Sequence, residues 1–223
     1  MVQRLTAEFG IEFSDAFCQT EASYLVAHGR SIPGELPSGR KTWCPQIEMR
    51  LVDDAGRRVR PGTPGQCLVR GPSLMSGYLD DPAATEEVFA DGWLHTGDVL
   101  VENEDATYTY VDRAKYLIKS GGENVFPAEV EQVLTLHPEV VEACAFGVPD
   151  PRWGEVVKVV VVVAPGATAT KEDLARWSRD RIASFKRPRY VEFMAAESLP
   201  RSTTGKLQRH LLAAAGARPE EQV

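Results

Sequence analysis

Hydrophobic and polar residues alternate most clearly in the middle of the chain. Residues 46–52 place apolar side chains at about every second position and end at an Asp-Asp-Ala-Gly turn, which is the pattern of a half-buried strand. A second strand is predicted over Gln66–Arg70, after the Pro- and Gly-rich turn at residues 61–65. Residues 108–111 alternate in the same way. This part of the chain is therefore predicted to be rich in β-structure.

After Val111 the pattern changes to helices mixed with strands. Pro127 fits the first position of a helix, and Glu129 and Glu131 follow it where negative charge suits the helix dipole. His137–Pro138 should end this helix. The remaining predicted elements are strands over Val140–Val148, Val156–Ala164 and Arg189–Met194, a helix from a Thr170/Asp173 capping box to about Ala183, and a helix over about Lys206–Ala215. We therefore expect a compact α+β domain of roughly 110 residues.

Length and composition set broad limits on the kind of protein. The chain has 223 residues, of which 43% are hydrophobic and 26% charged, values that exclude a disordered or fibrous chain. The longest apolar run, Val159–Ala164, is far too short to be a transmembrane segment. The first residues do not resemble a signal peptide, and the four cysteines contain no CxxC pair. We expect a soluble cytoplasmic protein with free thiols.

The net charge of −7 is unevenly distributed along the chain. Residues 1–111 carry 9 basic and 17 acidic side chains, whereas residues 112–223 carry 16 and 15. Basic side chains are concentrated near the end of the chain, between Lys186 and Arg209. Such a cluster could meet a nucleotide phosphate or a nucleic acid, or it could be a solvated face.

Two polar segments of the first half could bind a nucleotide. In Phe17–Glu21, a threonine hydroxyl could donate to a phosphate oxygen and the neighbouring carboxylate could hold Mg²⁺. The alternative is a helix N-cap with an acidic first turn. In Gly92–Asp98, a carboxylate after a glycine turn could accept two hydrogen bonds from vicinal hydroxyls, as on a ribose. The alternative here is an ordinary Thr-Gly-Asp turn.

Two further segments lie in the second half. In Asp112–Asn124, the adjacent Gly121 and Gly122 permit positive φ and close approach of the backbone to a ligand, but a hairpin turn explains them equally well. In Leu199–Lys206, a lysine on a flexible polar loop could carry its charge into a site formed elsewhere, or it could simply be solvated. Each of these segments is weak evidence of function when taken alone.

Taken in this order and spacing, the four segments resemble the adenylate-forming superfamily, and most closely its acyl-CoA ligases. The resemblance covers nearly the whole chain and is carried by Ser38–Arg40, Val69–Pro72, Gly77–Leu79, Trp93–Asp98, Val111–Arg113, Gly121–Val125, Pro127–Glu131, Gly147–Asp150, Trp153–Glu155, Phe185–Pro188 and Gly205–Lys206. It implies a fold of the α/β plus α+β class. The implied parts are a remnant of the large N-terminal α/β domain at residues 1–34, a β-barrel-like subdomain at 35–111 and a mobile α+β C-terminal domain at 112–223.

The resemblance also implies an activity, its cofactors and its nucleotide-binding residues. Such an enzyme joins a carboxylic acid to ATP, giving an acyl-adenylate and pyrophosphate, and then replaces AMP with the thiol of coenzyme A. Fatty acid metabolism is one setting for this chemistry, and no nucleic acid takes part. By position, Phe17 would stack on adenine, Thr20 would contact the α-phosphate, Glu21 would ligate Mg²⁺, and Asp98, with Arg113 beside it, would hold the ribose hydroxyls.

The C-terminal residues acquire roles in the same way. Lys115 falls at the hinge position, about which the small domain turns between the two half-reactions. Lys206 would bridge the carboxylate and the α-phosphate in the first step. Gly121 and Gly122 would line the channel for the thiol of coenzyme A, with Lys119 nearby in the second step.

Several features separate this chain from the family pattern, among them Cys18 in place of a common glycine, Phe17 in place of a frequent tyrosine and Asp105–Ala106 in place of an Asp-Gly turn. The resemblance places a phosphate loop rich in glycine, serine and threonine, together with much of the acyl pocket, upstream of Thr20, and no such loop precedes Thr20 here. Tyr116 stands after the hinge where aspartate is common, which predicts altered hinge energetics. We therefore expect a C-terminal part of a ligase that is inactive without the missing portion, with residues 1–34 poorly supported and partly exposed. The alternative is a stand-alone, non-catalytic module that binds a nucleotide or a partner.

Overall fold

The computed structural model describes residues 2–11, 13–30 and 39–216. The chain forms two compact units, residues 1–114 and 115–223, and each has a sheet and a hydrophobic core of its own. All four cysteines are free thiols, and three of them are buried. None of the described helices has both the length and the apolar character needed to cross a membrane.

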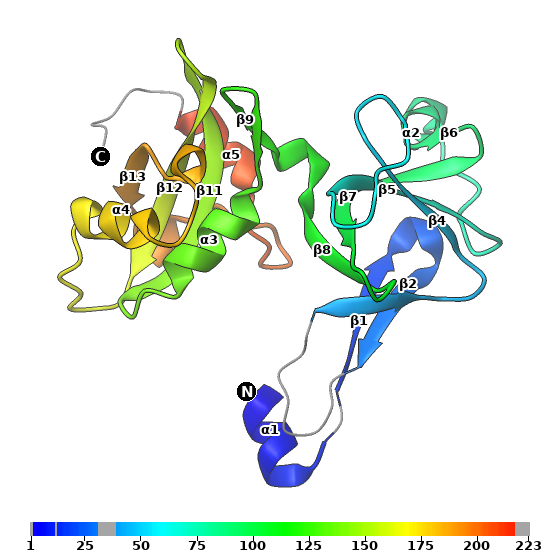
Figure 1. Ribbon diagram of the computed structural model, residues 1–223, viewed down its shortest axis with the longest axis horizontal. Helices are drawn as coiled ribbons and strands as arrows, with labels where there is room; N and C mark the ends of the chain where they lie inside the picture. The colour runs from blue at the N-terminus through cyan, green and yellow to red at the C-terminus, as the bar shows by residue number, and fades with distance from the viewer. Residues whose placement is uncertain (1, 12, 31–38, 217–223) are drawn as a thin grey trace. The chain divides into compact units, whose positions relative to one another are not determined.

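The first unit is built on an eight-stranded antiparallel sheet (Figure 1). In spatial order its strands are β1 (Ser14–Gln19), β2 (Tyr24–Arg30), β3 (Arg40–Trp43), β8 (Tyr108–Arg113), β7 (Trp93–Glu102), β5 (Gly65–Arg70) and β4 (Glu48–Val52), with β6 (Phe89–Ala90) also paired to β7. Helices α1 (Val2–Phe9) and α2 (Pro82–Val88) belong to the same unit. The strands predicted from alternation between residues 46 and 70 are confirmed as the β4–β5 hairpin.

The N-terminal hairpin β1–β2 is better supported than the sequence suggests. Strand β2 pairs with β3, and the buried Phe17, Ala22 and Val26 share one core with residues of β4, β5 and β7. The sheet therefore continues from the hairpin into the predicted barrel-like region without an edge between them. The region is nonetheless partly exposed: the Phe9 side chain is 67% exposed, and Thr20 and His28 are exposed further along the chain.

The second unit places helices on both faces of a mixed five-stranded sheet (Figure 1). Its elements are β9 (Ile118–Ser120), β10 (Glu123–Val125), α3 (Pro127–Thr135), β11 (Val140–Asp150), β12 (Gly154–Val163), α4 (Lys171–Arg179), β13 (Tyr190–Phe193) and α5 (Arg209–Ala215). Apolar residues of α3 and α4 pack on one face of β11 and β12, and Leu212 of α5 packs on the other. This arrangement confirms the predicted α+β character.

Local signals fixed most helix starts in this unit, but two predicted helix limits were wrong. Pro127 stands at the start of α3, and the Thr170/Asp173 capping box opens α4, both as predicted. Helix α4 ends at Arg179 rather than Ala183, because the chain leaves helical geometry at its C-cap. Helix α5 begins at Arg209, because the preceding residues close a separate turn through a β-bridge between Arg201 and Leu207.

Candidate functional site

The buried carboxylate of Asp98, on strand β7 next to β8, is the centre of the polar cluster in the first unit. Asp98 of β7 and Arg113 of β8 are register partners, and their side chains form an ion pair of 2.7 Å between Arg113 Nε and Asp98 Oδ1. The Asp98 side chain is 1% exposed, whereas that of Arg113 is 45% exposed. Gly97 lies within β7 rather than in a turn, and its φ of +71° suits glycine.

Gln19 holds the same carboxylate from the other side. Its Nε2 atom donates to Asp98 Oδ2 at 3.0 Å and to the carbonyl of Thr96 at 2.9 Å. Arg113 Nη1 also donates to the Thr96 carbonyl, at 3.3 Å. Both side chains therefore connect Asp98 to the same backbone oxygen and fix its orientation. Gln19 lies inside the Phe17–Glu21 segment, but its residue type alone did not indicate a role at the site.

The Thr20–Glu21 pair opens the 3₁₀ turn Thr20–Ala22, which follows β1 directly. Thr20 is exposed and Glu21 is half-buried. The phenol of Tyr78 donates to Glu21 Oε1 at 2.8 Å, and the backbone N–H of Met75 donates to the Glu21 carbonyl at 2.8 Å. The helix N-cap that was weighed as an alternative for this segment is not what forms here, since the turn has no side-chain cap and is only three residues long.

Burial sets the protonation of Asp98. Loss of solvent raises the pKa of its carboxyl to about 6, against the opposing effect of the Arg113 guanidinium, and the negative charge of Glu21 adds to the rise. At pH 7 about nine-tenths of the side chains are still ionised. The site therefore presents an oriented carboxylate that can accept hydrogen bonds near neutral pH and loses this capacity in mild acid.

Phe17 lies in the same unit but is largely covered. Its side chain is 9% exposed, and its ring meets the ring of Trp43 edge to face at 6.2 Å between centroids. A stacking residue needs one open ring face. The role predicted for Phe17 against adenine is therefore the least supported of the predicted nucleotide contacts.

In the second unit, the predicted glycines lie against a tryptophan. Gly121 has a φ of +61°, and a Cβ placed on it would come within 2.6 Å of the Trp153 ring, so only glycine fits there. A cavity of about 180 Å³ beside it is lined by Ser120, Gly121, Glu123, Trp153, Val156, Val157, Ser184, Phe185, Arg187 and Arg189. Gly122, at φ +87°, is exposed next to this cavity.

The three predicted lysines of this unit are all exposed and lie on different elements. Lys119 is on β9, where its backbone N–H donates to Glu155 Oε2 at 2.9 Å. Lys115 lies on the short turn Ala114–Tyr116, with its ammonium 5.0 Å from the centre of the Tyr116 ring. Lys206 lies in the closed turn ahead of α5.

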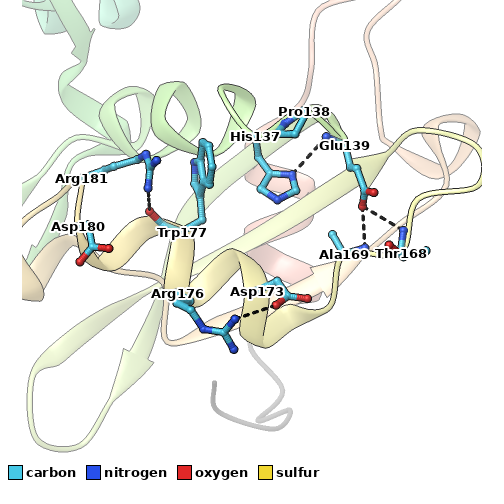
Figure 2. A pocket seen from close by; sticks show the side chains of 10 residues that line it. All are labelled: His137, Pro138, Glu139, Thr168, Ala169, Asp173, Arg176, Trp177, Asp180 and Arg181. Atoms are coloured by element: carbon cyan, nitrogen blue, oxygen red, sulfur yellow. Dashed lines mark hydrogen bonds and ion pairs between the residues drawn. The ribbon is translucent and has the colours of Figure 1, made fainter.

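A larger hollow of about 510 Å³ involves none of the predicted residues. Figure 2 shows its lining, which comes from the loop after α3, the loop before α4, α4 itself and the two residues that follow α4. Several of its charged groups are engaged in contacts: Glu139 accepts from the backbone N–H groups of Thr168 and Ala169, and Arg176 pairs with Asp173. Arg181 covers the ring of Trp177 at 3.6 Å. These contacts indicate that the lining residues serve to hold the fold together.

Comparison with known families decides the identity of these two units. The model of the AMP-binding enzyme family matches residues 1–79, and the model of the AMP-binding enzyme C-terminal domain matches residues 129–206. The two matches follow one another in the order of the two units. The chain belongs to the adenylate-forming AMP-binding enzymes.

Individual AMP-binding enzymes agree with this assignment. A feruloyl-CoA synthase of Amycolatopsis is 48% identical over 161 residues, covering 72% of this chain and 32% of that protein. A long-chain-fatty-acid–CoA ligase of Escherichia coli is 44% identical over 168 residues, covering 75% and 29%. The crystal structure of o-succinylbenzoate CoA synthetase from Bacillus subtilis with its acyl-adenylate intermediate superposes with a TM-score of 0.82 at 29% identity, covering 100% of this chain and 44% of that one.

The adenylate-forming relatives are considerably longer than this chain. The chain spans about a third of the length of these curated proteins, and its portion corresponds to an acyl-CoA synthetase or ligase. As an adenylate-forming chain, it brings Gln19, Asp98 and Arg113 together in one unit, with Thr20 and Glu21 directly following. The predicted residues Lys119, Gly121, Gly122 and Lys206 all belong to the other unit.

Proposed function

We propose that this chain supplies part of an ATP-dependent carboxylate–CoA ligase. In the first step a carboxylate oxygen of the acid attacks the α-phosphorus of ATP, and pyrophosphate leaves. In the second step the sulfur of coenzyme A attacks the acyl carbon, and AMP leaves. The observation that carries the proposal is the buried Asp98 carboxylate, oriented by Gln19 and Arg113 directly beside the Thr20–Glu21 turn.

Asp98 suits the ribose of the nucleotide. A carboxylate has about four lone-pair positions, and Gln19 and Arg113 each occupy one of them, so acceptor capacity remains for two vicinal hydroxyls. Charge-assisted bonds of this kind are about twice as strong as neutral ones. Both partners also bond the Thr96 carbonyl and so hold the carboxylate in one orientation, but its side chain is only 1% exposed, so the half-exposed Arg113 has to move aside for a ribose to reach it.

Glu21 suits the magnesium ion that accompanies ATP. Magnesium usually binds proteins through one or two carboxylates, keeps several waters and takes its other ligands from the substrate phosphates. Among the described residues no cluster of three or more acidic, His or Cys side chains forms a metal cage. A single half-buried carboxylate with one oxygen held by Tyr78 fits an ion that is bound mainly through the nucleotide. The exposed Thr20 hydroxyl next to it can donate to the α-phosphate.

The cavity beside Gly121 suits coenzyme A. Arg187 and Arg189 supply positive charge for phosphate groups, and Phe185 and Trp153 supply aromatic surface for an organic ligand. Gly122 leaves room for the thiol arm at its mouth, since nothing lies within 4 Å of its missing Cβ. These features support the predicted thiol channel at Gly121 and Gly122.

Two lysines divide the work in this proposal. Lys206 neutralises the charge that develops when the two anions approach in the first step, and Lys119 serves the second step. Their positions on separate elements of one unit support a rotation about Lys115 that presents first one face and then the other. We propose no substrate narrower than a carboxylic acid, because the relatives carry the names of substrates as different as ferulate and long-chain fatty acids.

Carboxylate-dependent ATP–pyrophosphate exchange tests this function. The assay compares the 223-residue chain with the longest protein that its gene encodes in the same frame, against a panel of aliphatic and aromatic acids. We expect exchange only in a protein that also contains the glycine-, serine- and threonine-rich phosphate loop. Exchange by the 223-residue chain alone would contradict the prediction that it needs a missing portion. Nucleotide binding without exchange in any form would favour the stand-alone binding module instead.

A further inference from the structure

The turn that carries Lys206 is a closed structure rather than a flexible loop. Its two ends meet in the Arg201–Leu207 bridge, and the N–H of Gln208 donates to the carbonyl of Pro200 at 2.8 Å. Inside the turn, the N–H of Ser202 donates to the Lys206 carbonyl at 2.8 Å. The backbone of Lys206 therefore has a defined position relative to the base of the turn.

Arg201 fastens this turn to the central sheet. Its Nη2 atom bonds Glu142 Oε2, on the long strand β11. Its Nη1 atom donates to the carbonyl of Gly205 at 3.2 Å, one residue before Lys206. One guanidinium thus connects the tip of the turn with a strand that lies 59 residues away in the sequence. The planar guanidinium, with its fixed donors, suits such a two-ended contact.

Arg209 fastens the other end of the turn. Its Nη2 atom pairs with Glu131 Oε1 of α3 at 2.6 Å, and the same oxygen accepts the N–H of Ala145 of β11 at 2.8 Å. The two side chains are mostly buried. The guanidinium also lies 4.5 Å from the centre of the Tyr116 ring, next to Lys115.

We propose that Arg201 and Arg209 are positioning residues for Lys206, with Glu142 and Glu131 as their anchors. This inference rests on the proposed role of Lys206 in acid activation. A lysine carries its ammonium on a flexible four-carbon stem, so the ammonium is placed well only if the backbone is held. Small displacements of a charged group from the reacting atoms lower the rate strongly. The two ion pairs keep the base of Lys206 in place while its side chain stays exposed and mobile.

The Arg201–Glu142 pair can be separated from the stability of the unit. Both side chains are about one-third exposed, and Leu199 and Leu207 on either side of the turn pack into the core independently of the pair. Ion pairs of this exposure contribute little to overall stability. Removing the pair should therefore loosen the turn without unfolding the domain.

The first experiment measures the turn directly in the 223-residue chain. A protease that cleaves after lysine is used to follow cleavage at the Lys206–Leu207 bond in wild type, Glu142→Gln and the control Glu172→Gln. Glu172 is an exposed residue of α4, away from this pair. We expect roughly two- to fivefold faster cleavage in E142Q, the range set by a partly exposed ion pair, with unchanged thermal unfolding and no change in E172Q. Equal cleavage rates in all three proteins would show that the Arg201–Glu142 pair does not hold the Lys206 turn.

The second experiment tests whether the Arg201–Glu142 pair affects catalysis, in the longer protein that shows ATP–pyrophosphate exchange. We expect Glu142→Gln and Arg201→Met to lower kcat of adenylation with little change in the KM of ATP, and to leave thioester formation from supplied acyl-adenylate intact. Arg201→Lys, which keeps the charge, should recover part of the rate. If Lys206→Ala abolishes adenylation but the other variants do not lower it, the positioning role is wrong. If Lys206→Ala leaves adenylation intact, the proposed function of Lys206 fails instead.

Discussion

Replacing Asp98 with asparagine should raise the stability of the first unit at alkaline pH while it weakens nucleotide binding. A pKa of about 6 in the folded chain, against 3.8 for an ordinary aspartate, means that the folded state binds this proton more tightly than the unfolded state. The stabilising effect of the proton is complete below pH 3.8 and is lost as the pH rises through 6. The free energy of unfolding should therefore fall by about 3 kcal/mol over this range.

The variant Asp98→Asn is neutral at every pH and does not show this loss. It also brings a donor amide to the position of Oδ2, where the Gln19 amide donates, and this mismatch costs about 1 kcal/mol. The two effects together predict a crossing. D98N should be about 1 kcal/mol less stable than wild type near pH 4 and about 2 kcal/mol more stable near pH 8. D98N should nevertheless bind AMP more weakly than wild type near pH 8, because the charged hydrogen-bond acceptor is gone.

Urea unfolding at pH 4 and pH 8 measures the crossing. Trp43 and Trp93 report on the first unit when Trp153 and Trp177 are replaced by phenylalanine. The matched control is Asp105→Asn. The hydrogen bond from the Thr107 hydroxyl lowers the pKa of this exposed carboxyl, so removing the Asp105 charge should cause only a slight loss of stability at pH 8. Stability curves of wild type and D98N that run parallel with pH would refute a raised pKa for Asp98. Undiminished AMP affinity of D98N would refute its contact with the ribose.

Three further variants test other parts of the two units. Gly121→Ala should destabilise the second unit by about 1–3 kcal/mol in thermal or urea unfolding, because its backbone is left-handed and its Cβ would strike the Trp153 ring; an unchanged midpoint would contradict this. Tyr78→Phe should weaken Mg²⁺-dependent ATP binding severalfold by freeing one oxygen of Glu21, with binding in EDTA unchanged, as measured by calorimetry. Tyr116→Leu removes the ring between two cations and should change the ratio of the two half-reaction rates, whereas an unchanged ratio would exclude a role at the hinge.

Elements with a local cause could be predicted from the sequence. The hairpin at residues 46–70 follows from alternation and turn residues, and the starts of α3 and α4 follow from Pro127 and the Thr170 capping box. The start of α5 could not be predicted in this way, because the turn before it is closed by backbone hydrogen bonds that no residue type indicates. A lysine loop that the sequence describes as flexible is therefore a closed turn.

Contacts between distant segments could not be predicted in the same way. Gln19 and Asp98 are 79 residues apart, and Glu21 and Tyr78 are 57 apart, so neither pair shares a local pattern. The pKa of Asp98 is likewise a property of the folded sheet, because burial is its main cause. The burial of Phe17 likewise depends on a distant residue, because its ring meets that of Trp43, 26 positions further along the chain.

Part of the basic cluster near the end of the chain is used within the fold. Its density suggested a surface for phosphates, but Lys186, Arg201 and Arg209 each pair with a carboxylate of their own unit. Two of these pairs hold the ends of the Lys206 turn. Their charges are therefore largely neutralised within the fold, and the positive charge of the turn is concentrated in the exposed ammonium of Lys206. A phosphate that reaches this face would meet one exposed cation on a held backbone, which is the arrangement that the proposed first half-reaction needs.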